Sequence, residues 1–492
     1  MTGRFACCPL ATIAAKPHAV QLRFELAELV FVITGRSTGA SDRGIFVKSR
    51  LLLTTLAPAL LLAAAPAHAA DLAPPAFGAG VVMPELDNLD VEAFMLTQRR
   101  NAPLWFGPTG GPEAVSSLVQ ILRRAQLDGL PQGPALADAV EAAARDAAPG
   151  APPAILARAD RTLSAAWLAY VAAMKAPLVG YTYSDPYLTP RQQSGLLTLQ
   201  RAASAPSLAA HIAAIASPNP IYNAMRDAAW RGMQRAQMTV PSRRVLINLA
   251  RARIFPTTGK FLVVNAATQQ LTMVENGQVA DQMKVIIGRP DSQTPMLAST
   301  IWYATVNPYW YVPVDLTQKI VAKKMLSPIA KPYWKGKRYE IMSDFGPSPT
   351  ILPPTSIDWH AVQSGAQTVY LRQLPGEGNS MGVIKFSFPN DIGVYLHDTD
   401  LHVLFAQKIR TLSNGCIRLE DAKRVGRWLM GRDPMTMTAS TLPEQHLRLP
   451  RGVPVYLTYL TAQPRADGEL TFVPDVYGRD GDGPVGTVVK QI

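Results

Sequence analysis

The sequence predicts an α+β protein in which a helical N-terminal domain precedes a mainly antiparallel β domain with an inserted lid. From about Val91 to Ile254, apolar residues recur at three- and four-residue spacing, which is typical of amphipathic helices. After Pro256, short runs rich in β-branched and aromatic residues replace this pattern. The chain is 48% hydrophobic and 17% charged, which favours a folded core over disorder.

The first part of the chain carries a candidate export signal. Lys48 and Arg50 precede the uncharged apolar stretch Leu51–Ala70, which contains the Ala67-His68-Ala69 pattern of a cleavage site. We therefore expect a signal peptide over residues 47–69; a transmembrane anchor is the alternative, although the stretch is short for a span. We expect residues 1–46 to be a gene-model extension preceding a start at Val47, the alternative being a cytoplasmic tail.

After an Ala-, Pro- and Gly-rich linker over residues 70–88, we expect a helical domain over residues 89–255. Pro and Gly separate its helical segments, and His211 lies on an Ala/Ile-rich face, which indicates a packed residue. The expected helices are Ala114–Leu127, Ala135–Ala147, Ile155–Ala173, Pro190–Ala203 and Ile221–Gln237.

The β domain is expected over residues 256–465, with a C-terminal tail over 466–492. Asn276-Gly277 predicts a hairpin turn between two of its strands. Residues 315–372 are polar, basic and Pro-rich, and we interpret them as an insertion that forms a lid, the alternative being a surface excursion without that role. The expected strands are Lys260–Asn265, Gln270–Glu275, Gln282–Ile287, Ile301–Asn307, Gly382–Phe388, Val394–His397 and Val453–Leu460.

Charge and cysteine content exclude several classes of protein. The net charge is +12, but no run of five Lys/Arg residues occurs, so we expect no nucleic-acid partner. Residues 1–69 hold seven Lys/Arg and three Asp/Glu, so residues 70–492 carry a net charge of +8.

Three cysteines cannot form a disulfide scaffold or a four-cysteine zinc site. Cleavage after Ala69 leaves only Cys416, a thiol that is either buried and inert or kept for chemistry.

Cys416 lies in a pattern that suits nucleophilic catalysis. His397 ends a short apolar strand, and the thiol follows nineteen residues later in Ser413-Asn414-Gly415-Cys416-Ile417-Arg418. A helix is expected to begin at Glu420-Asp421, so we expect the thiol just before a helix N-terminus. His397 could accept the thiol proton, while Arg418 and the helix end stabilise the thiolate. Backbone N–H groups at Gly415 and Cys416 could form an oxyanion hole, giving Cys–His acyl transfer.

Each of these residues also has an ordinary structural interpretation. Cys416 could be a small core residue, and Ser413 and Asn414 could only shape a turn. Arg418 could only pair with a neighbouring acid. His402 is a weaker alternative base.

The pattern resembles the active-site signature of the L,D-transpeptidases, the YkuD-domain enzymes of bacterial cell walls. That signature is a His, a spacer and then Ser/Thr-His-Gly-Cys-x-Arg, matched here by His397 and by Ser413–Arg418 with Asn414 in the second position. The resemblance extends to the large Gram-negative branch with a helical N-terminal scaffold. Further matching motifs are Asn307–Pro313, Arg372–Gly382, Phe388–Asn390, Tyr395–Thr399, Val455–Tyr459 and Asp475–Asp480.

The resemblance implies a periplasmic enzyme that acts on peptidoglycan stem peptides without metal or nucleotide. Cys416 would attack the third stem residue, D-Ala would leave, and the thioester would pass to a second stem as a 3–3 crosslink. His397 would be acid and base. The resemblance assigns oxyanion-hole or substrate-binding roles to Gly415, Arg418, Ser413, Asn414, Tyr395, Asn379 and Gly382.

Two departures from the family pattern leave alternatives open. Asn414 replaces the usual His and cannot shuttle a proton, and the chain leaves no room for the branch's usual peptidoglycan-binding module ahead of the catalytic domain. An L,D-carboxypeptidase, a lipoprotein-anchoring enzyme, an inactive peptidoglycan-binding scaffold and a protein-cleaving cysteine protease remain alternatives. The pattern names no partner protein.

Overall fold

A computed structural model describes residues 91–95, 103–178, 180–438 and 442–481. The predicted gene-model extension, signal peptide and linker lie outside these ranges, as do residues 482–492 of the tail. Within the described residues, none of the helices has the length and apolar character needed to cross a membrane.

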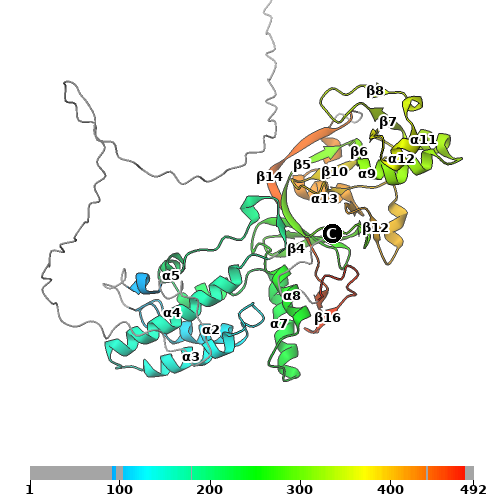
Figure 1. The fold of residues 1–492 in the computed structure, drawn as a ribbon. Coiled ribbons are helices and arrows are strands. Elements are labelled where there is room, and N and C mark those ends of the chain that lie inside the picture. The colour runs from blue at the N-terminus through cyan, green and yellow to red at the C-terminus, as the bar shows by residue number, and fades with distance from the viewer. Residues whose placement is uncertain (1–90, 96–102, 179, 439–441, 482–492) are drawn as a thin grey trace, which may run out of the picture. The chain divides into compact units, whose positions relative to one another are not determined.

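The N-terminal region is helical, as predicted (Figure 1). Four of its helices begin at side chains that accept a hydrogen bond from the first turn: Ser194, Ser207, Asn219 and Ser242. The last of these caps a helix that the periodicity analysis did not separate. The helices are α2 (Pro112–Arg123), α3 (Gly133–Asp146), α4 (Pro153–Lys175), α5 (Gly195–Ala203), α6 (Leu208–Ile215), α7 (Pro220–Arg235) and α8 (Arg243–Ala252).

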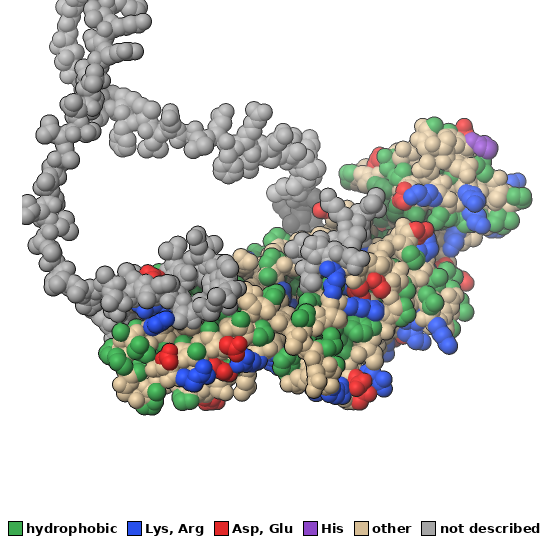
Figure 2. Space-filling view, turned by 60° about the horizontal axis from the view of Figure 1, so that its bottom comes forward, with side chains coloured by type: hydrophobic (Ala, Val, Ile, Leu, Met, Phe, Trp, Pro, Cys, Tyr) green, Lys and Arg blue, Asp and Glu red, His purple; other side chains and the backbone are tan. Residues whose placement is uncertain are grey.

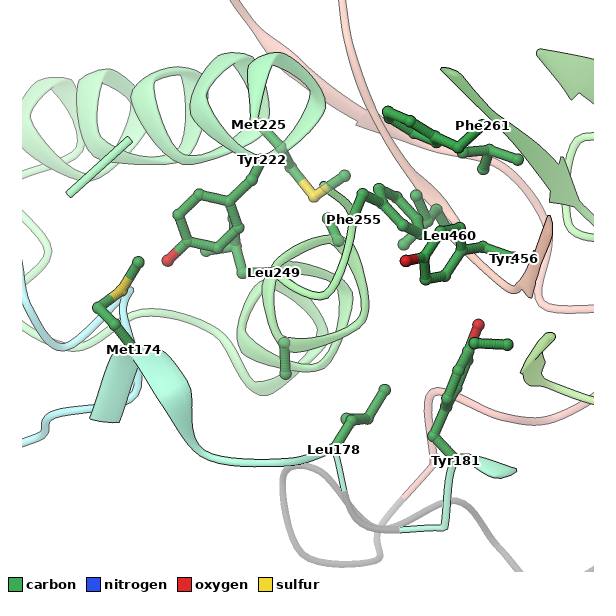
Figure 3. Close-up of a cluster of buried hydrophobic side chains, with 14 of the residues drawn as sticks. Met174, Leu178, Tyr181, Tyr222, Met225, Leu249, Phe255, Phe261, Tyr456 and Leu460 are labelled. Carbon is green, nitrogen blue, oxygen red and sulfur yellow. The ribbon is translucent and has the colours of Figure 1, made fainter. Parts of the chain in front are cut away.

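Helices and sheet share a buried hydrophobic cluster (Figure 3). Phe255, which follows α8, meets the Tyr456 ring edge-on with 5.4 Å between ring centroids. Between α4 and α5, Tyr181 donates its hydroxyl hydrogen bond to the carbonyl oxygens of Leu297 and Leu457, at 2.8 and 3.1 Å. These contacts anchor the helical region to the sheet that carries the site.

The sheet begins with two predicted strands, and the second of them leads into the predicted hairpin turn. Strands β2 (Lys260–Asn265) and β3 (Gln270–Glu275) have the predicted bounds, and Asn276 and Gly277 both take positive φ in the turn that follows. The remaining strands of this sheet are β1 (Thr182–Tyr183), β4 (Gln278–Gly288), β5 (Leu297–Val306), β10 (Ile384–Ser387), β11 (Leu396–His397), β12 (Thr411–Ser413), β13 (Ile417–Leu419) and β14 (Gln445–Thr458).

The sheet is closed, because its last strand pairs with a strand near the start of the order. The order is β1-β5-β10-β11-β13-β4-β3-β2-β14, and β14 also pairs with β5. Most pairings are antiparallel, as predicted, but β1–β5, β11–β13, β12–β4 and β14–β2 are parallel. The predicted α+β class is confirmed, and one of the parallel pairs carries the candidate site.

The insertion folds as a small unit with its own sheet and core. Its strands β6 (Trp310–Val312), β9 (Tyr370–Gln373), β7 (Tyr339–Met342) and β8 (Ile351–Leu352) pair in that order. Val312, Ile341 and Leu371 are among its buried residues. Its helical segments are α9 (Val314–Leu316), η3 (Thr317–Ala322), α10 (Lys323–Met325), α11 (Ala330–Lys337), η4 (Pro354–Ser356) and α12 (Trp359–Ser364). Figure 2 shows Lys and Arg side chains on the surface at the right, where the insertion lies in Figure 1.

The described part of the C-terminal tail is ordered by contacts with the rest of the fold. Strands β15 (Ala462–Pro464) and β16 (Leu470–Phe472) form a hairpin, and residues 475–481 then return to the sheet. Tyr477 and Arg479 are buried, at 7% and 4% exposure. This segment is therefore part of the folded catalytic region.

Candidate active site

The site is built on one face of the parallel pair β11–β13. Leu396 pairs with Ile417 and His397 with Arg418. Side chains alternate between the faces of a strand, so the buried Leu396 and Ile417 face the core, and His397 and Arg418 share the opposite face. Tyr395 and Cys416 lie two residues before them, so the alternation directs them to the same face.

The Cys416 thiol is half-buried and receives both hydrogen bonds that Tyr395 can donate, from its backbone N–H and its hydroxyl. The Sγ also lies 3.9 Å from the carbonyl oxygen of Gly393. Burial raises the pKa of the Cys416 thiol, and the hydrogen bonds from Tyr395 and the charge of Arg418 oppose that shift without cancelling it. The resting nucleophile is therefore a neutral thiol at neutral pH.

His397 is a buried, neutral imidazole. Its Nδ1 lies 2.5 Å from the backbone oxygen of Asp398, and since a carbonyl only accepts, Nδ1 carries the proton. Burial, together with the charges of Arg418 and Lys385, lowers the pKa of His397 to about 3. Hydrogen bonds to the backbone carbonyls of Asp398 and Ser380 act in the opposite direction, because they favour the protonated ring, but they do not cancel this shift. This leaves Nε2 as the ring nitrogen with a lone pair.

Arg418 supplies a cation with spare hydrogen-bonding capacity. Its buried Nε has no partner among the described residues. Glu420 pairs with Lys284 and Asp421 with Arg424, so neither neighbouring acid neutralises Arg418. The simple structural role considered for Arg418, an ion pair with one of these acids, is therefore not observed.

Ser413 closes the loop that presents the thiol. Its hydroxyl donates to the Cys416 carbonyl oxygen at 2.6 Å and accepts from the Gly415 N–H at 3.2 Å. Gly415 has φ +113°, a conformation that favours glycine. The Gly415 N–H is thus occupied, whereas the Cys416 N–H has no acceptor in the described part of the chain. Asn414 is exposed at the rim.

The helix predicted after the thiol begins where expected, with Asp421 as its N-cap, but it does not follow Cys416 directly. Strand β13 follows the thiol, and helix α13 (Ala422–Met430) begins only after it. Asp421 caps that helix by accepting from the Arg424 N–H at 2.9 Å. Stabilisation of the thiolate therefore comes from Tyr395 and Arg418 and not from a helix dipole.

A cavity of about 750 Å³ opens over this face. The catalytic strands supply one wall, and the insertion contributes a second. Lining residues from the insertion and the segment leading into it are Trp310, Pro313, Asp315, Leu316, Lys319 and Ile320. Among the described residues, no group of three or more His, Cys, Asp or Glu side chains could hold a metal ion.

Comparisons with known proteins match two parts of the chain. Residues 259–455 match the family model of the L,D-transpeptidase catalytic domain, and residues 96–228 match that of the scaffold domain. Residues 259–455 form an L,D-transpeptidase catalytic domain. The predicted resemblance, including the helical scaffold, is confirmed.

The individual relatives have low sequence identity to this chain. A Haemophilus influenzae protein, named as a candidate L,D-transpeptidase, is 28% identical over 49% of this chain and 48% of its own length. The chain thus spans about half the length of that curated relative. A solved L,D-transpeptidase from Mycobacterium smegmatis is 15% identical, with a TM-score of 0.20, over 41% of this chain and 59% of that one.

Two predicted substrate-binding residues of the L,D-transpeptidase domain lie outside the main cavity. Asn379 is 1% exposed, and its amide donates to the carbonyls of Pro308 and Leu374 and accepts from the Met381 N–H. The hydrogen bonds of its side chain are all made within the protein, where they hold the loop after β9. Gly382 has φ +61°, and a Cβ there would clash with the Asp398 carboxylate. Both shape the loop, and neither offers a group to a ligand.

His402, the alternative base, belongs to a second cavity. It lies 3.2 Å from Asp398 Oδ1, and both line a cavity of about 610 Å³ that does not include Cys416. His397 lines the same cavity as the thiol. The geometry therefore favours His397 as the base of the L,D-transpeptidase domain.

Several residues at the site were given no individual role in the sequence analysis. The Trp310 indole donates to the Tyr395 hydroxyl, which itself donates to Cys416. Thr294 donates its hydroxyl to the Gly415 carbonyl at 2.8 Å. Trp310 and Tyr477 lie in motifs quoted for the family resemblance, which was the available signal; Thr294 lies in none of them.

Proposed function

We propose that this protein is a peptidoglycan L,D-transpeptidase that forms 3–3 crosslinks through a Cys416 thioester. The observation that carries the proposal is the grouping of a thiol, a neutral imidazole and a cation on one face of β11–β13, at a cavity large enough for a peptide stem. This arrangement suits acyl transfer by a covalent intermediate.

In the first step, His397 Nε2 takes the thiol proton as Cys416 Sγ attacks the carbonyl carbon of the third stem residue. The C–N bond to D-Ala then breaks, and the imidazolium returns the proton to the leaving amine. The carbonyls of Asp398 and Ser380 face the ring and stabilise its protonated form during this step. The enzyme is left as a thioester.

In the second step, the side-chain amine of a second stem attacks the thioester carbon and gives a proton to His397. The C–S bond breaks, the new amide is the 3–3 crosslink, and the proton returns to the thiolate. The Cys416 N–H, which has no acceptor among the described residues, is the oxyanion donor we assign. Tyr395 donates to the sulfur whenever it carries negative charge.

We assign Arg418 to a carboxylate of the donor stem. A carboxylate at the cavity would supply the partner that its buried Nε lacks among the described residues. The basic insertion would meet the same acidic peptides: Lys323, Lys324, Lys331 and Lys335 are exposed, with no ion pair to described residues. The +8 charge after residue 69 suits a periplasmic protein that handles an acidic wall polymer.

The test is incubation of the full-length protein with purified tetrapeptide muropeptides, followed by mass spectrometry. A crosslinked dimer with loss of D-Ala supports the proposal, whereas tripeptide monomer alone indicates a carboxypeptidase. Cys416→Ala should abolish both products. Equal product profiles for native protein and Cys416→Ala would reject catalysis and leave a peptidoglycan-binding scaffold.

A further inference from the structure

Residues 475–481, which we call the C-terminal strap, run between helix α8 and the loop that holds the nucleophile. We propose that the strap is a positioning device for Cys416 and that Tyr477 and Thr294 are its positioning residues. This inference rests on the proposed role of Cys416 as nucleophile. Most of the strap lies in the motif Asp475–Asp480, to which the sequence analysis gave no role.

One end of the strap is fixed to α8 by buried charges. The Arg251 guanidinium is 2% exposed and pairs with Asp480 at 2.7 Å, while it also donates to the Arg479 carbonyl at 2.5 Å. Arg244 pairs with the other oxygen of Asp480 at 2.8 Å. Separating the two charges of such a buried ion pair would leave each of them uncompensated, which is costly. The pair therefore holds this end of the strap against α8.

The middle of the strap is rigid. Asp475 accepts from the Tyr459 hydroxyl at 2.7 Å and from the backbone N–H groups of Arg479 and Asp480 at 3.0 and 2.8 Å. The rings of Tyr459 and Tyr477 stack with 5.2 Å between centroids, and the Arg479 guanidinium lies over both rings. These contacts fix the directions of the Tyr477 hydroxyl and the Arg479 guanidinium.

The side chains of Tyr477 and Arg479 connect the strap to the turn that follows β4. Tyr477 donates to the Gly288 carbonyl at 2.6 Å and accepts from the Thr294 N–H at 3.4 Å. Arg479 donates to the Thr294 carbonyl at 2.8 Å and to Gln293 Oε1 at 3.0 Å. The two ends of this turn, at Gly288 and Thr294, are therefore both bonded to the strap.

Thr294 passes this constraint to the nucleophile loop. Its hydroxyl, on a residue that is 1% exposed, accepts from the Gly288 N–H at 2.9 Å and donates to the Gly415 carbonyl at 2.8 Å. That carbonyl belongs to the peptide group that carries the Cys416 N–H. The series of bonds thus ends at the peptide group next to the sulfur, whose position determines whether Tyr395 can donate to it.

The experiment measures the pH profile of Cys416 alkylation by iodoacetamide in the purified protein, with the peptide that contains Cys416 followed by mass spectrometry. Tyr477→Phe keeps the ring stacking and removes the hydroxyl, and Thr294→Val removes the hydroxyl at constant shape. Both should shift the alkylation midpoint to higher pH and lower the rate at pH 8 about fivefold, the size expected for one buried hydrogen bond. Thr294→Ser should restore native behaviour.

Arg235→Gln is the matched control, because Arg235 links α7 to the C-terminal hairpin through Glu469 at 3.2 Å outside the strap. An unchanged midpoint in folded Tyr477→Phe overturns the proposal, whatever the fate of Thr294→Val. An equal shift in Arg235→Gln also overturns it, because general loosening then explains the effect. Alkylation does not require acyl transfer, so failure of the proposed function would show separately, as no D-Ala release by native protein.

Discussion

The helical region and the catalytic region both bury polar groups, and those of the catalytic region line a cavity. In the helices, the Asp128 carboxylate accepts from the hydroxyls of Tyr170 and Tyr222 at 2.9 and 2.5 Å and pairs with Arg226 at 3.4 Å. In the catalytic region, the Arg418 Nε has no partner among the described residues, and His397 keeps a lone pair on Nε2. Arg226 Nε also lacks a hydrogen-bond partner among the described residues, but Arg226 is 2% exposed and lines neither of the two cavities described above, whereas His397 and Arg418 line the cavity over Cys416. Unused hydrogen-bonding capacity therefore indicates a place for a ligand in the catalytic region, where a ligand can reach it.

The largest expected effect tests the catalytic side of this comparison. His397→Gln should lower D-Ala release about a hundred- to ten-thousandfold, because it removes the general base. The variant should remain folded by circular dichroism. Its matched control is His402→Gln in the second cavity, which should stay within about twofold of native. A similar loss in both variants would contradict the assignment of His397.

The next effect tests the helical side. Asp128→Asn should lower the free energy of unfolding by about 3–5 kcal/mol, because it leaves Arg226 buried without its counter-charge. Urea denaturation measures this change, and D-Ala release per folded molecule should not change. Asp138→Asn is the control on an exposed ion pair with Arg123, where about 1 kcal/mol or less is expected. Equal destabilisation by both variants would remove the distinction between the clusters.

A third prediction uses two buried groups whose pKa values shift in opposite directions. The pKa of His397 falls to about 3, so between pH 6.5 and 3 the unfolded state binds more protons and stability falls as the pH is lowered. Burial raises the pKa of Asp160 in the helices to about 6, so its stabilising contribution is lost as the pH rises from about 4 through 6.

Urea denaturation between pH 4 and 6 should separate these contributions. His397→Gln should reduce the increase of stability with pH, and Asp160→Asn should enlarge it, each by up to about 1.4 kcal/mol per pH unit. Slopes that move in the same direction in both variants would contradict the assignment of the two groups.

The smallest effect concerns Tyr395. Tyr395→Phe removes the hydroxyl that donates to the thiol and keeps the backbone N–H that also does so. The loss of one hydrogen bond to a charged sulfur should slow D-Ala release about tenfold and move the alkylation midpoint of Cys416 to higher pH. If the rate and the midpoint both stay at native values, the hydroxyl has no part in stabilising the thiolate.

The elements that sequence analysis located well are those with local signals. The β3–β4 hairpin has adjacent strands and an Asn276-Gly277 turn of defined chemistry, so it was predictable, although β4 begins at Gln278 and not at the predicted Gln282. Cys416 and His397 were identified as candidates from their spacing and the family resemblance. The comparison with family models confirms the domain type but does not test individual residues.

What sequence analysis missed depends on contacts between distant residues. The run Ile417–Leu419 is too short to predict as a strand, so a loop was expected between the thiol and the helix, although its partner strand at Leu396–His397 was predicted within Val394–His397. Asn379 looks like an exposed polar residue in a Gly-rich loop, but the carbonyls that it bonds come from both sides of the insertion. No local pattern reports such pairings.

The closure of the sheet through β14 has a consequence for the order in which the chain is synthesised. Strand β14, which ends at Thr458, pairs with one edge of β5 and with one edge of β2. Until residues 445–458 have left the ribosome, β2 and β5 each present an unpaired edge, which is open to pairing with other chains. A nascent chain that stalls before residue 445 is therefore a form of this protein that should depend on a chaperone.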